Sequence, residues 1–238
     1  MNDSARVDAE LEALARRYAL GEGVAARLAA VLAALAAEPH PQTTVRTPEE
    51  AVTVHVGDSL AALELPAVRA AGRICDIGSG AGFPGIPLAI ALPDTAVDLI
   101  EAARRKCVVI ERLAAAGAAV NARVVSERAE AWASGAGREA YDLVTARAVA
   151  SLAVLVEYAA PLLRDGGTLV AWKGRRDPDE ERAGAAAAEL LGLAPAEVRA
   201  VVPFEAARDR HLHAFSKTGR TPAGFPRRAG RAGKRPLA

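Results

Sequence analysis

The sequence DIGSGAGFPG, from Asp76 to Gly85, decides the fold. It follows a short β-type run, Ile74–Ile77, and precedes an apolar stretch of helical character, Ile86–Leu92. Glycines placed directly after a strand and before a helix let the backbone turn tightly and approach a ligand without a Cβ in the way. In an open α/β sheet such a loop lies at the carboxyl edge of the strands, where ligands bind. We therefore expect a ligand-binding loop here.

Strand-like and helical stretches alternate beyond this loop. The β-type runs are 96–100, 123–125, 141–145 and 168–172, with two more at 198–203 and 211–216. The helical stretches are 104–116, 152–163 and an Ala-rich segment before residue 198. This alternation predicts an α/β fold, with a Rossmann-like, mostly parallel sheet and helices on both faces.

The chain divides into three parts. Residues 1–65 read as an N-terminal helical extension, because apolar residues recur there at three- and four-residue steps. Gly21 and Gly23 are expected to separate two helices within it. Residues 66–217 hold the Rossmann-like core. Residues 218–238 are a basic tail rich in Arg, Gly and Pro, which we expect to be disordered until it meets a partner.

The composition fits one large domain or a core with a small extension. The chain has 238 residues, 51% of them hydrophobic, and a net charge of +1, which argues against a disordered protein. Its two cysteines, Cys75 and Cys107, form neither a disulfide framework nor a C-x-x-C metal spacing. The sequence shows no signal-peptide pattern and no apolar run of about 18 residues. We expect a cytoplasmic monomer that binds neither a membrane nor a metal.

Two ligands are compatible with the glycine loop. Gly80–Gly85 is a literal G-x-G-x-x-G, the dinucleotide fingerprint. Asp76, two residues ahead of Gly78, extends the motif to D-x-G-x-G-x-G, and its carboxylate can orient the loop and meet a cationic ligand but would repel a pyrophosphate. We favour S-adenosylmethionine as the cofactor, contacted by Asp76, Gly78, Gly80 and Gly82. A dinucleotide, or a turn without a ligand, remains an alternative.

Three charged residues follow later strands at the same edge. Glu101 lies 23 positions after Gly78 and is placed to accept hydrogen bonds from both ribose hydroxyls. Glu130 and the backbone near Ala129 are placed to bind the adenine, although a solvated helix start is the alternative interpretation. Arg147 directly follows a buried-looking strand, so we expect it to contact the ligand or a substrate phosphate, and it is our catalytic candidate.

The remaining residues narrow the kind of methyl transfer. Methylation of cytosine C5 needs a cysteine nucleophile, but Cys75 and Cys107 both fall inside expected buried elements. Adenine N6 methyltransferases usually carry an Asn/Asp-Pro-Pro-aromatic clamp where this chain has Thr145–Ala148. The lone pair of guanine N7 is already nucleophilic at neutral pH, so its methylation can rest on alignment and charge. The absence of an obvious base is consistent with that acceptor.

Five motifs together resemble those of the glucose-inhibited division protein B family, also called RsmG. The resemblance covers roughly residues 45–217 and rests on HVGDSL (55–60), the glycine loop continued through FPGIP (83–87), RAVASL (147–152), WKG (172–174) and RHL (210–212). Members of this family are guanine-N7 methyltransferases of bacterial small-subunit (16S) ribosomal RNA. The resemblance therefore implies that enzyme activity, S-adenosylmethionine as the donor, and the small ribosomal subunit as the partner.

The resemblance also implies roles for individual residues. Donor contacts fall on Gly78, Phe83, Ala129, Glu130 and Arg147. A basic cleft facing RNA would contain the cations Arg128, Arg147, Lys173 and Arg210. The sequence departs from the family's common pattern in two places, which are Pro41–Thr44 and the ribose acid, here Glu101 rather than Asp.

Some alternatives stay open. His55 and Asp58 lie one helical turn apart, and we expect them to hold the N-terminal helices onto the core rather than to transfer protons. Lys173 is placed either to contact RNA phosphate or to cap the sheet edge, and His211 is expected to be structural or to contact RNA. An oxidoreductase using a nicotinamide dinucleotide and an RNA-binding factor without catalytic activity are the two rival functions.

Overall fold

The computed structural model describes residues 3–40, 42–45, 47–205 and 207–238, so Pro41 of the departing segment lies outside the described residues. The helices are α1 (Asp3–Arg17), α2 (Val24–Ala36), α3 (Pro48–Ala51), the π-helix η1 (Val52–Gly57), α4 (Asp58–Leu60), the 3-10 helix η2 (Ala61–Glu64), α5 (Pro66–Arg69), α6 (Gly85–Ala91), α7 (Arg104–Ala116), α8 (Ala129–Ala133), α9 (Leu152–Ala159), α10 (Pro178–Leu190) and α11 (Arg231–Lys234). The strands are β1 (Arg73–Ile77), β2 (Ala96–Ile100), β3 (Ala122–Val125), β4 (Tyr141–Arg147), β5 (Leu163–Lys173), β6 (Leu193–Ala200) and β7 (His211–Lys217).

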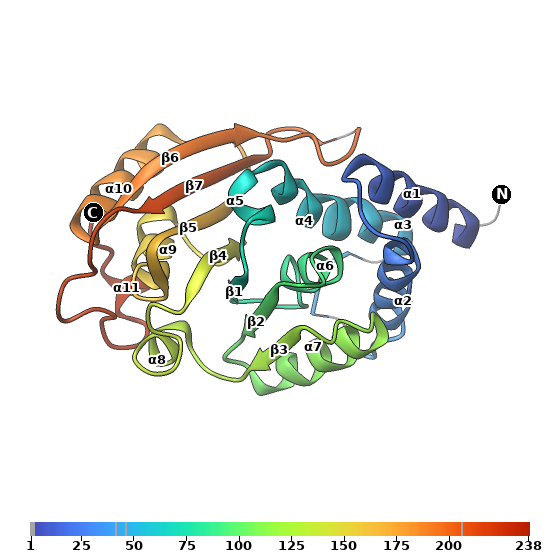
Figure 1. Ribbon diagram of the computed structural model, residues 1–238, viewed down its shortest axis with the longest axis horizontal. Coiled ribbons are helices and arrows are strands. Elements are labelled where there is room, and N and C mark those ends of the chain that lie inside the picture. Colours follow the sequence, from blue (N-terminus) through green and yellow to red (C-terminus); the bar gives the residue numbers. More distant parts are fainter. Residues whose placement is uncertain (1–2, 41, 46, 206) are drawn as a thin grey trace.

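The seven strands form one sheet in the order β3-β2-β1-β4-β5-β7-β6 (Figure 1). Strands β1 to β5 are parallel, and β7 runs antiparallel to both β5 and β6. The strand order reverses between β1 and β4, and at such a switch point the loops at the carboxyl ends diverge and leave a crevice for a ligand. The glycine loop follows β1, directly beside this point.

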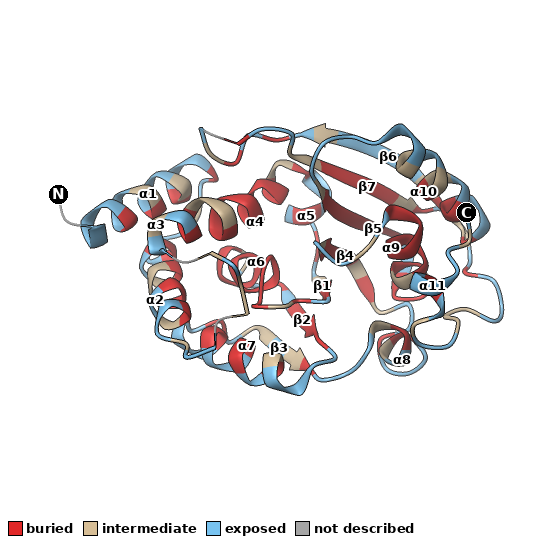
Figure 2. Ribbon diagram, turned by 180° about the vertical axis from the view of Figure 1, so that it is seen from behind, coloured by how far each residue is buried: buried red, intermediate tan, exposed pale blue. Residues whose placement is uncertain are grey.

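Successive residues of the central strands belong to two different cores. Ile74, Leu143 and Val170 pack with α1, α2, α6 and α7 on one face, whereas Cys75 and Val144 pack with α9 and α10 on the other. This alternation follows from the two-residue side-chain period of a strand. Both faces are covered, which explains why the parallel strands read as continuous apolar runs (Figure 2).

The N-terminal helices share a core with the sheet. Gly23 has a φ of +77° and ends the turn between α1 and α2, as the two glycines of that turn predict. Leu11 and Leu28 are fully buried, and α2 packs against α6 and α7. The segment from α3 to η2 then carries His55 and Asp58 across to the carboxyl edge of the sheet. No helix in the described ranges is long and apolar enough to cross a membrane.

The structure differs from the expected strands mainly at the antiparallel end. We expected a strand over 198–203, but β6 spans Leu193–Ala200. This edge strand is mostly exposed and contains Pro195, so its residues carry no apolar alternation, and its register is fixed instead by pairing with β7. Strand β5 also begins at Leu163 rather than at residue 168, and α9 ends correspondingly early, at Ala159.

The C-terminal tail, which we expected to be disordered, packs against the core. Arg227 forms an ion pair with the Glu157 carboxylate, which is 2% exposed, and Gly230 N–H donates to Glu130 Oε1 over 2.7 Å. Phe225 packs against the core that lies beside α9. Composition could not reveal these contacts, because the buried acidic partners lie in α8 and α9, 100 and 70 residues earlier in the chain respectively.

Candidate active site at the carboxyl edge of the sheet

The glycine loop turns through three left-handed glycines. Gly78, Gly80 and Gly82 have φ values of +65°, +62° and +90°, which side-chain-bearing residues rarely adopt. Gly78 and Ser79 donate their N–H groups to the carbonyl of Ile100, at 2.9 and 3.1 Å, so the loop is fastened across the end of β2. A Cβ on Gly78 would lie 2.9 Å from Val149 Cγ2, in the loop after β4. Gly82 instead makes room for the Ile86 side chain.

Asp76 supports this loop from inside the protein. Its carboxylate is fully buried and accepts hydrogen bonds from Thr145 Oγ1 at 2.8 Å and from Gly85 N–H at 3.2 Å. Burial raises the pKa of Asp76 to about 6, against the opposing effect of these hydrogen bonds. The carboxylate therefore joins β1, β4 and the start of α6, while its direct contact with a cationic ligand stays a prediction.

Glu101 lies at the end of β2, facing the same loop. Its two carboxylate oxygens accept hydrogen bonds from Gly80 N–H at 3.2 Å and from Ala103 N–H at 2.8 Å. The residue is 8% exposed, so the carboxylate is fixed in position. A carboxylate keeps free lone pairs after two such bonds, and a fixed acceptor beside a glycine loop suits a pair of ribose hydroxyls.

Ala129 and Glu130 begin α8, after β3. Glu130 lies in the first turn of α8, but it is 8% exposed and accepts a hydrogen bond from Gly230 N–H. The alternative of a solvated helix start is therefore wrong for this residue. Arg128, the N-cap residue of α8, is exposed. We call Asp76–Gly85 together with Glu101 and Glu130 the glycine-loop edge.

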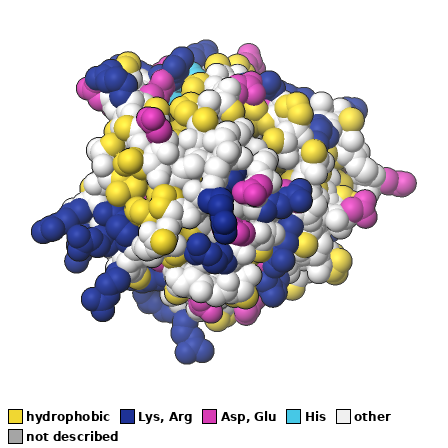
Figure 3. Space-filling view, turned by 60° about the vertical axis from the view of Figure 1, so that its left-hand side comes forward, with side chains coloured by type: hydrophobic (Ala, Val, Ile, Leu, Met, Phe, Trp, Pro, Cys, Tyr) yellow, Lys and Arg dark blue, Asp and Glu magenta, His cyan; other side chains and the backbone are white. Residues whose placement is uncertain are grey.

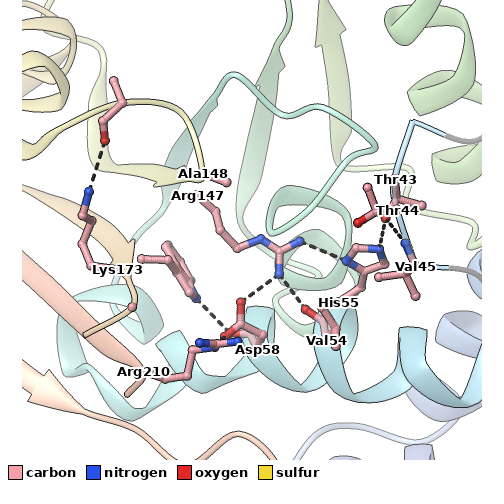
Figure 4. Close-up of a pocket in the computed structure, with 13 residues that line it drawn as sticks. Thr43, Thr44, Val45, Val54, His55, Asp58, Arg147, Ala148, Lys173 and Arg210 are labelled. Atoms are coloured by element: carbon pink, nitrogen blue, oxygen red, sulfur yellow. Dashed lines mark hydrogen bonds and ion pairs between the residues drawn. The ribbon is translucent and has the colours of Figure 1, made fainter. Parts of the chain in front are cut away.

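Arg147, the last residue of β4, reaches toward the N-terminal segment. Its guanidinium donates to Asp58 Oδ2 at 2.9 Å, to the Val54 carbonyl at 3.0 Å and to His55 Nδ1 at 3.3 Å (Figure 4). The guanidinium carbon also lies 5.9 Å from the centre of the Phe83 ring. The predicted structural role of His55 and Asp58 is thus exerted through Arg147.

His55 contacts both the glycine loop and Arg147. Its ring stacks on Phe83 of the glycine loop, with the ring centres 4.5 Å apart and the planes 13° from parallel. Because Nδ1 accepts from Arg147, the ring proton sits on Nε2 and is donated to Thr43 Oγ1, 2.8 Å away. Burial, and secondarily the charge of Arg147, lower the pKa of His55 to about 4, so the ring is neutral at physiological pH.

A cavity of about 440 Å³ opens beside Arg147 at the carboxyl ends of β4 and β5. It brings three of the predicted RNA-facing cations together, Arg147, Lys173 and Arg210, and we call it the cationic cavity. The fourth, Arg128, is not among the described residues that line it. The other lining residues are Thr43, Thr44, Val45, Val54, His55, Asp58, Ala148, Ala150, Trp172 and Gly174.

The cations of the cavity are held with unequal strength. Lys173 Nζ forms an ion pair with Glu180 Oε1 at 2.5 Å and a hydrogen bond with the Ala150 carbonyl at 3.3 Å. Arg210 is held loosely, because its Nε lies 3.9 Å from Asp58 Oδ1, a buried oxygen that lacks a hydrogen-bond partner among the described residues. Arg210 Nη1 also donates to the Arg208 carbonyl at 3.4 Å, and the side chain is 41% exposed, so these weak contacts leave it able to turn toward an incoming anion.

Trp172 also belongs to this site, although we did not predict it from the sequence. Its indole N–H donates to the carbonyl of Asp58 at 2.9 Å, and its ring forms part of the cavity wall. The residue stands inside the WKG motif, so a signal was present, but the contact joins positions 114 residues apart and could not be read from spacing.

A family model described as rRNA small subunit methyltransferase G matches residues 27–212. The chain belongs to this family. Two similar proteins, both named ribosomal RNA small subunit methyltransferase G, come from Rubrobacter xylanophilus and Desulfitobacterium hafniense. The first is 44% identical, covering 81% of this chain and 75% of the relative, and the second is 39% identical, covering 82% and 81%. The resemblance to this family is thereby confirmed.

Solved structures support the fold. A predicted O-methyltransferase from Agrobacterium tumefaciens is 25% identical, with a TM-score of 0.51 over 69% of this chain and 80% of that one. The 16S rRNA (adenine(1408)-N(1))-methyltransferase from Catenulisporales acidiphilia is 17% identical, with a TM-score of 0.51 over 66% and 91%. The predicted Rossmann-like methyltransferase fold is confirmed, and the family decides for a methyltransferase over the nicotinamide oxidoreductase.

Proposed function

We propose that this protein transfers the methyl group of S-adenosylmethionine to N7 of a guanine in small-subunit (16S) ribosomal RNA, in the cytoplasm. The observation that carries the proposal is the meeting of two unlike sites at one sheet edge. The glycine-loop edge suits a small ligand with a ribose, and the cationic cavity suits a polyanion. The His55–Phe83 stack joins them.

The glycine-loop edge fits the donor in its backbone and its acceptors. Gly78 and Gly80 have left-handed conformations and present backbone without a Cβ. Glu101 is a fixed acceptor beside them that still has free lone pairs. When bound, S-adenosylmethionine supplies an electrophilic methyl group on a sulfonium. Glu101 is the residue to accept the ribose hydroxyls, and Ala129 and Glu130 lie where the adenine would be read.

The cationic cavity fits the RNA. Arg147, Lys173 and Arg210 line the cavity of about 440 Å³, next to the loop after β4. The planar guanidinium of an arginine can donate two parallel hydrogen bonds to the oxygens of one phosphate. Three hydrogen bonds fix the Arg147 guanidinium, so this cation is suited to position the nucleotide. Arg210 is held only weakly, so its side chain can adjust to the phosphates of the RNA. The cavity itself is too small for more than about one nucleotide.

The chemistry of the edge favours an acceptor that needs no activation. Cys75 and Cys107 are 0% and 4% exposed, and burial raises the pKa of the Cys75 thiol, so neither is a nucleophile for cytosine. His55 is neutral, but both ring nitrogens are engaged with Arg147 and Thr43. Guanine N7 carries a free lone pair, and its methylation removes no proton, so alignment by the protein suffices.

Methyl transfer from labelled S-adenosylmethionine to unmodified small-subunit rRNA, offered free and in small subunits, tests the proposal. Parallel calorimetric titrations with S-adenosylmethionine and NAD define the ligand of the loop. We expect binding of S-adenosylmethionine, no binding of NAD, and label in the RNA. Binding of NAD without S-adenosylmethionine, or donor binding without label in either RNA substrate, would contradict the proposal.

A further inference from the structure

The C-terminal segment carries a group of cations that the cationic cavity does not use. Arg228, Arg231, Lys234 and Arg235 are all exposed and line a surface hollow of about 650 Å³ with Ala229 and Gly230. We call these four side chains the C-terminal basic surface. Figure 3 shows the side of the molecule on which α8, α10 and α11 lie, with many Lys and Arg side chains gathered on it.

This surface has a fixed position on the core. Arg227 is held by the buried Glu157, and its guanidinium also donates to the Arg235 carbonyl at 2.8 Å, which closes the segment on itself. Ala232 is 1% exposed, and α11 packs against α9. The four cations are thus presented from an anchored turn and helix, so binding an anion would not require the segment to become ordered first.

The charges of the surface are uncompensated. None of the four side chains forms an ion pair within the described part of the chain. Of the two nearby acids, Glu157 pairs with Arg227, and Glu130 is 8% exposed and turned to the Gly230 N–H, so neither forms an ion pair with these cations. Four like charges without counter-charges raise the local positive potential and attract a polyanion.

We propose that the C-terminal basic surface binds phosphates of the substrate RNA at a place distinct from the cationic cavity, next to the adenine side of the donor site. The inference rests on the proposed function. The hydrogen bond between Gly230 and Glu130 puts the surface directly beside α8, and the cationic cavity is lined by a different set of residues. A nucleotide chain, unlike a single phosphate, can occupy both.

RNA fits this surface better than an anionic membrane does. Membrane-surface segments combine cations with large exposed apolar side chains that enter the lipid. Among the described residues, the lining of the hollow contains Ala and Gly besides the cations and no large apolar side chain, and α11 has four residues. Arginine is three of the four cations, and its planar fork matches phosphate geometry.

The test is the salt dependence of RNA binding by a variant with Arg228, Arg231, Lys234 and Arg235 all replaced by Gln. Each neutralised phosphate contributes about 0.7 to 0.9 to the slope of log affinity against log salt concentration. Against unmodified 16S rRNA, we expect the slope to fall by about 3 and the affinity at about 0.1 M salt to fall at least tenfold. Donor affinity is expected to stay unchanged.

A matched control removes four exposed arginines elsewhere, Arg6, Arg16, Arg164 and Arg182, and we expect its slope to change by less than about 1. Equal losses in the two variants would mean that net charge alone matters and would overturn the inference. An unchanged slope in the C-terminal variant would overturn it as well. The methyl-transfer assay on the wild-type protein separates this inference from the proposed function. Transfer by the wild type keeps the proposed function even if the salt slopes overturn the inference, whereas no transfer by the wild type overturns the proposed function itself. Unfolding curves check that both variants fold.

Discussion

The two halves of the carboxyl edge are built in opposite ways. The glycine-loop edge comes largely from one ten-residue stretch, and it shapes its site with backbone conformation and three buried carboxylates, Asp76, Glu101 and Glu130. The cationic cavity is assembled from five distant segments around residues 43–45, 54–58, 147–150, 172–174 and 210, and it shapes its site with charged side chains. We expect the backbone of the loop to enclose a compact ligand and the charged side chains of the cavity to meet a long anionic one. Changes in the glycine-loop edge should therefore leave RNA binding intact, and changes in the cationic cavity should leave donor binding intact.

The largest expected effect is at Gly78. In Gly78→Val, the side chain would require a left-handed backbone and would collide with Val149, so we expect donor affinity to fall at least 100-fold while RNA affinity stays within about twofold. Titration calorimetry and RNA binding measure the two. Gly166→Val is the control, because Gly166 also has a positive φ, +76°, but open space around it. Retained donor binding in Gly78→Val would remove the loop from the donor site.

Arg147→Gln tests the cationic cavity. The change leaves the buried Asp58 with only the distant Arg210, 3.9 Å away, as a charged partner, so we expect a stability loss of about 3 kcal/mol and a fall in methyl transfer of about 100-fold at saturating donor. The double variant Arg147→Gln with Asp58→Asn should regain most of the stability, measured by denaturant unfolding, but not the activity. Activity that returns with stability would reduce Arg147 to a structural residue.

His55 makes the junction between the edges sensitive to pH. Its folded pKa of about 4 lies below the value near 6.5 of the unfolded chain, so between these pH values the unfolded state binds more protons and stability falls as pH falls. Between pH 7 and pH 4 we expect the wild type to lose up to about 3 kcal/mol of unfolding free energy through His55. The His55→Phe variant should not show this loss, although its ring can still stack on Phe83. The free energy of unfolding is measured for the wild type and for His55→Phe at each pH, and the two values are subtracted. The subtraction removes the contribution of His213, whose pKa burial also lowers and which is present in both proteins. Parallel curves would contradict the neutral, buried state of His55.

The smallest expected effect is at Lys173. Its ammonium is paired with Glu180, so its contribution to RNA binding is partly offset, and we expect Lys173→Gln to weaken RNA binding by about three- to tenfold without changing donor affinity. Arg182→Gln, an exposed cation paired with Asp179 on α10, is the matched control. Equal RNA binding by Lys173→Gln and the wild type would leave Lys173 as a cap of the sheet edge.

The same contrast explains what the sequence could predict. The strands, the loop and the position of Glu101 follow from local patterns, and the backbone N–H groups of Gly78, Ser79 and Gly80 bond to Ile100 and Glu101, within about two dozen residues along the chain. The contacts between Arg147 and Asp58, between Trp172 and Asp58, and between Arg227 and Glu157 join positions 70 to 114 residues apart, so no spacing reveals them. The tail was misjudged for this reason, since its order depends on acids in α8 and α9. Strand β6 was misplaced because an exposed edge strand lacks an apolar pattern.

The identity of the methylated nucleoside tests the central claim most directly. Unmodified small ribosomal subunits and their free rRNA would be treated with the protein and S-adenosylmethionine, digested to nucleosides and analysed by mass spectrometry against methylated standards. We expect 7-methylguanosine as the new product, and none of it when Gly78→Val replaces the wild type. A methylated adenosine or cytidine, or no new methylated nucleoside from either substrate, would contradict it.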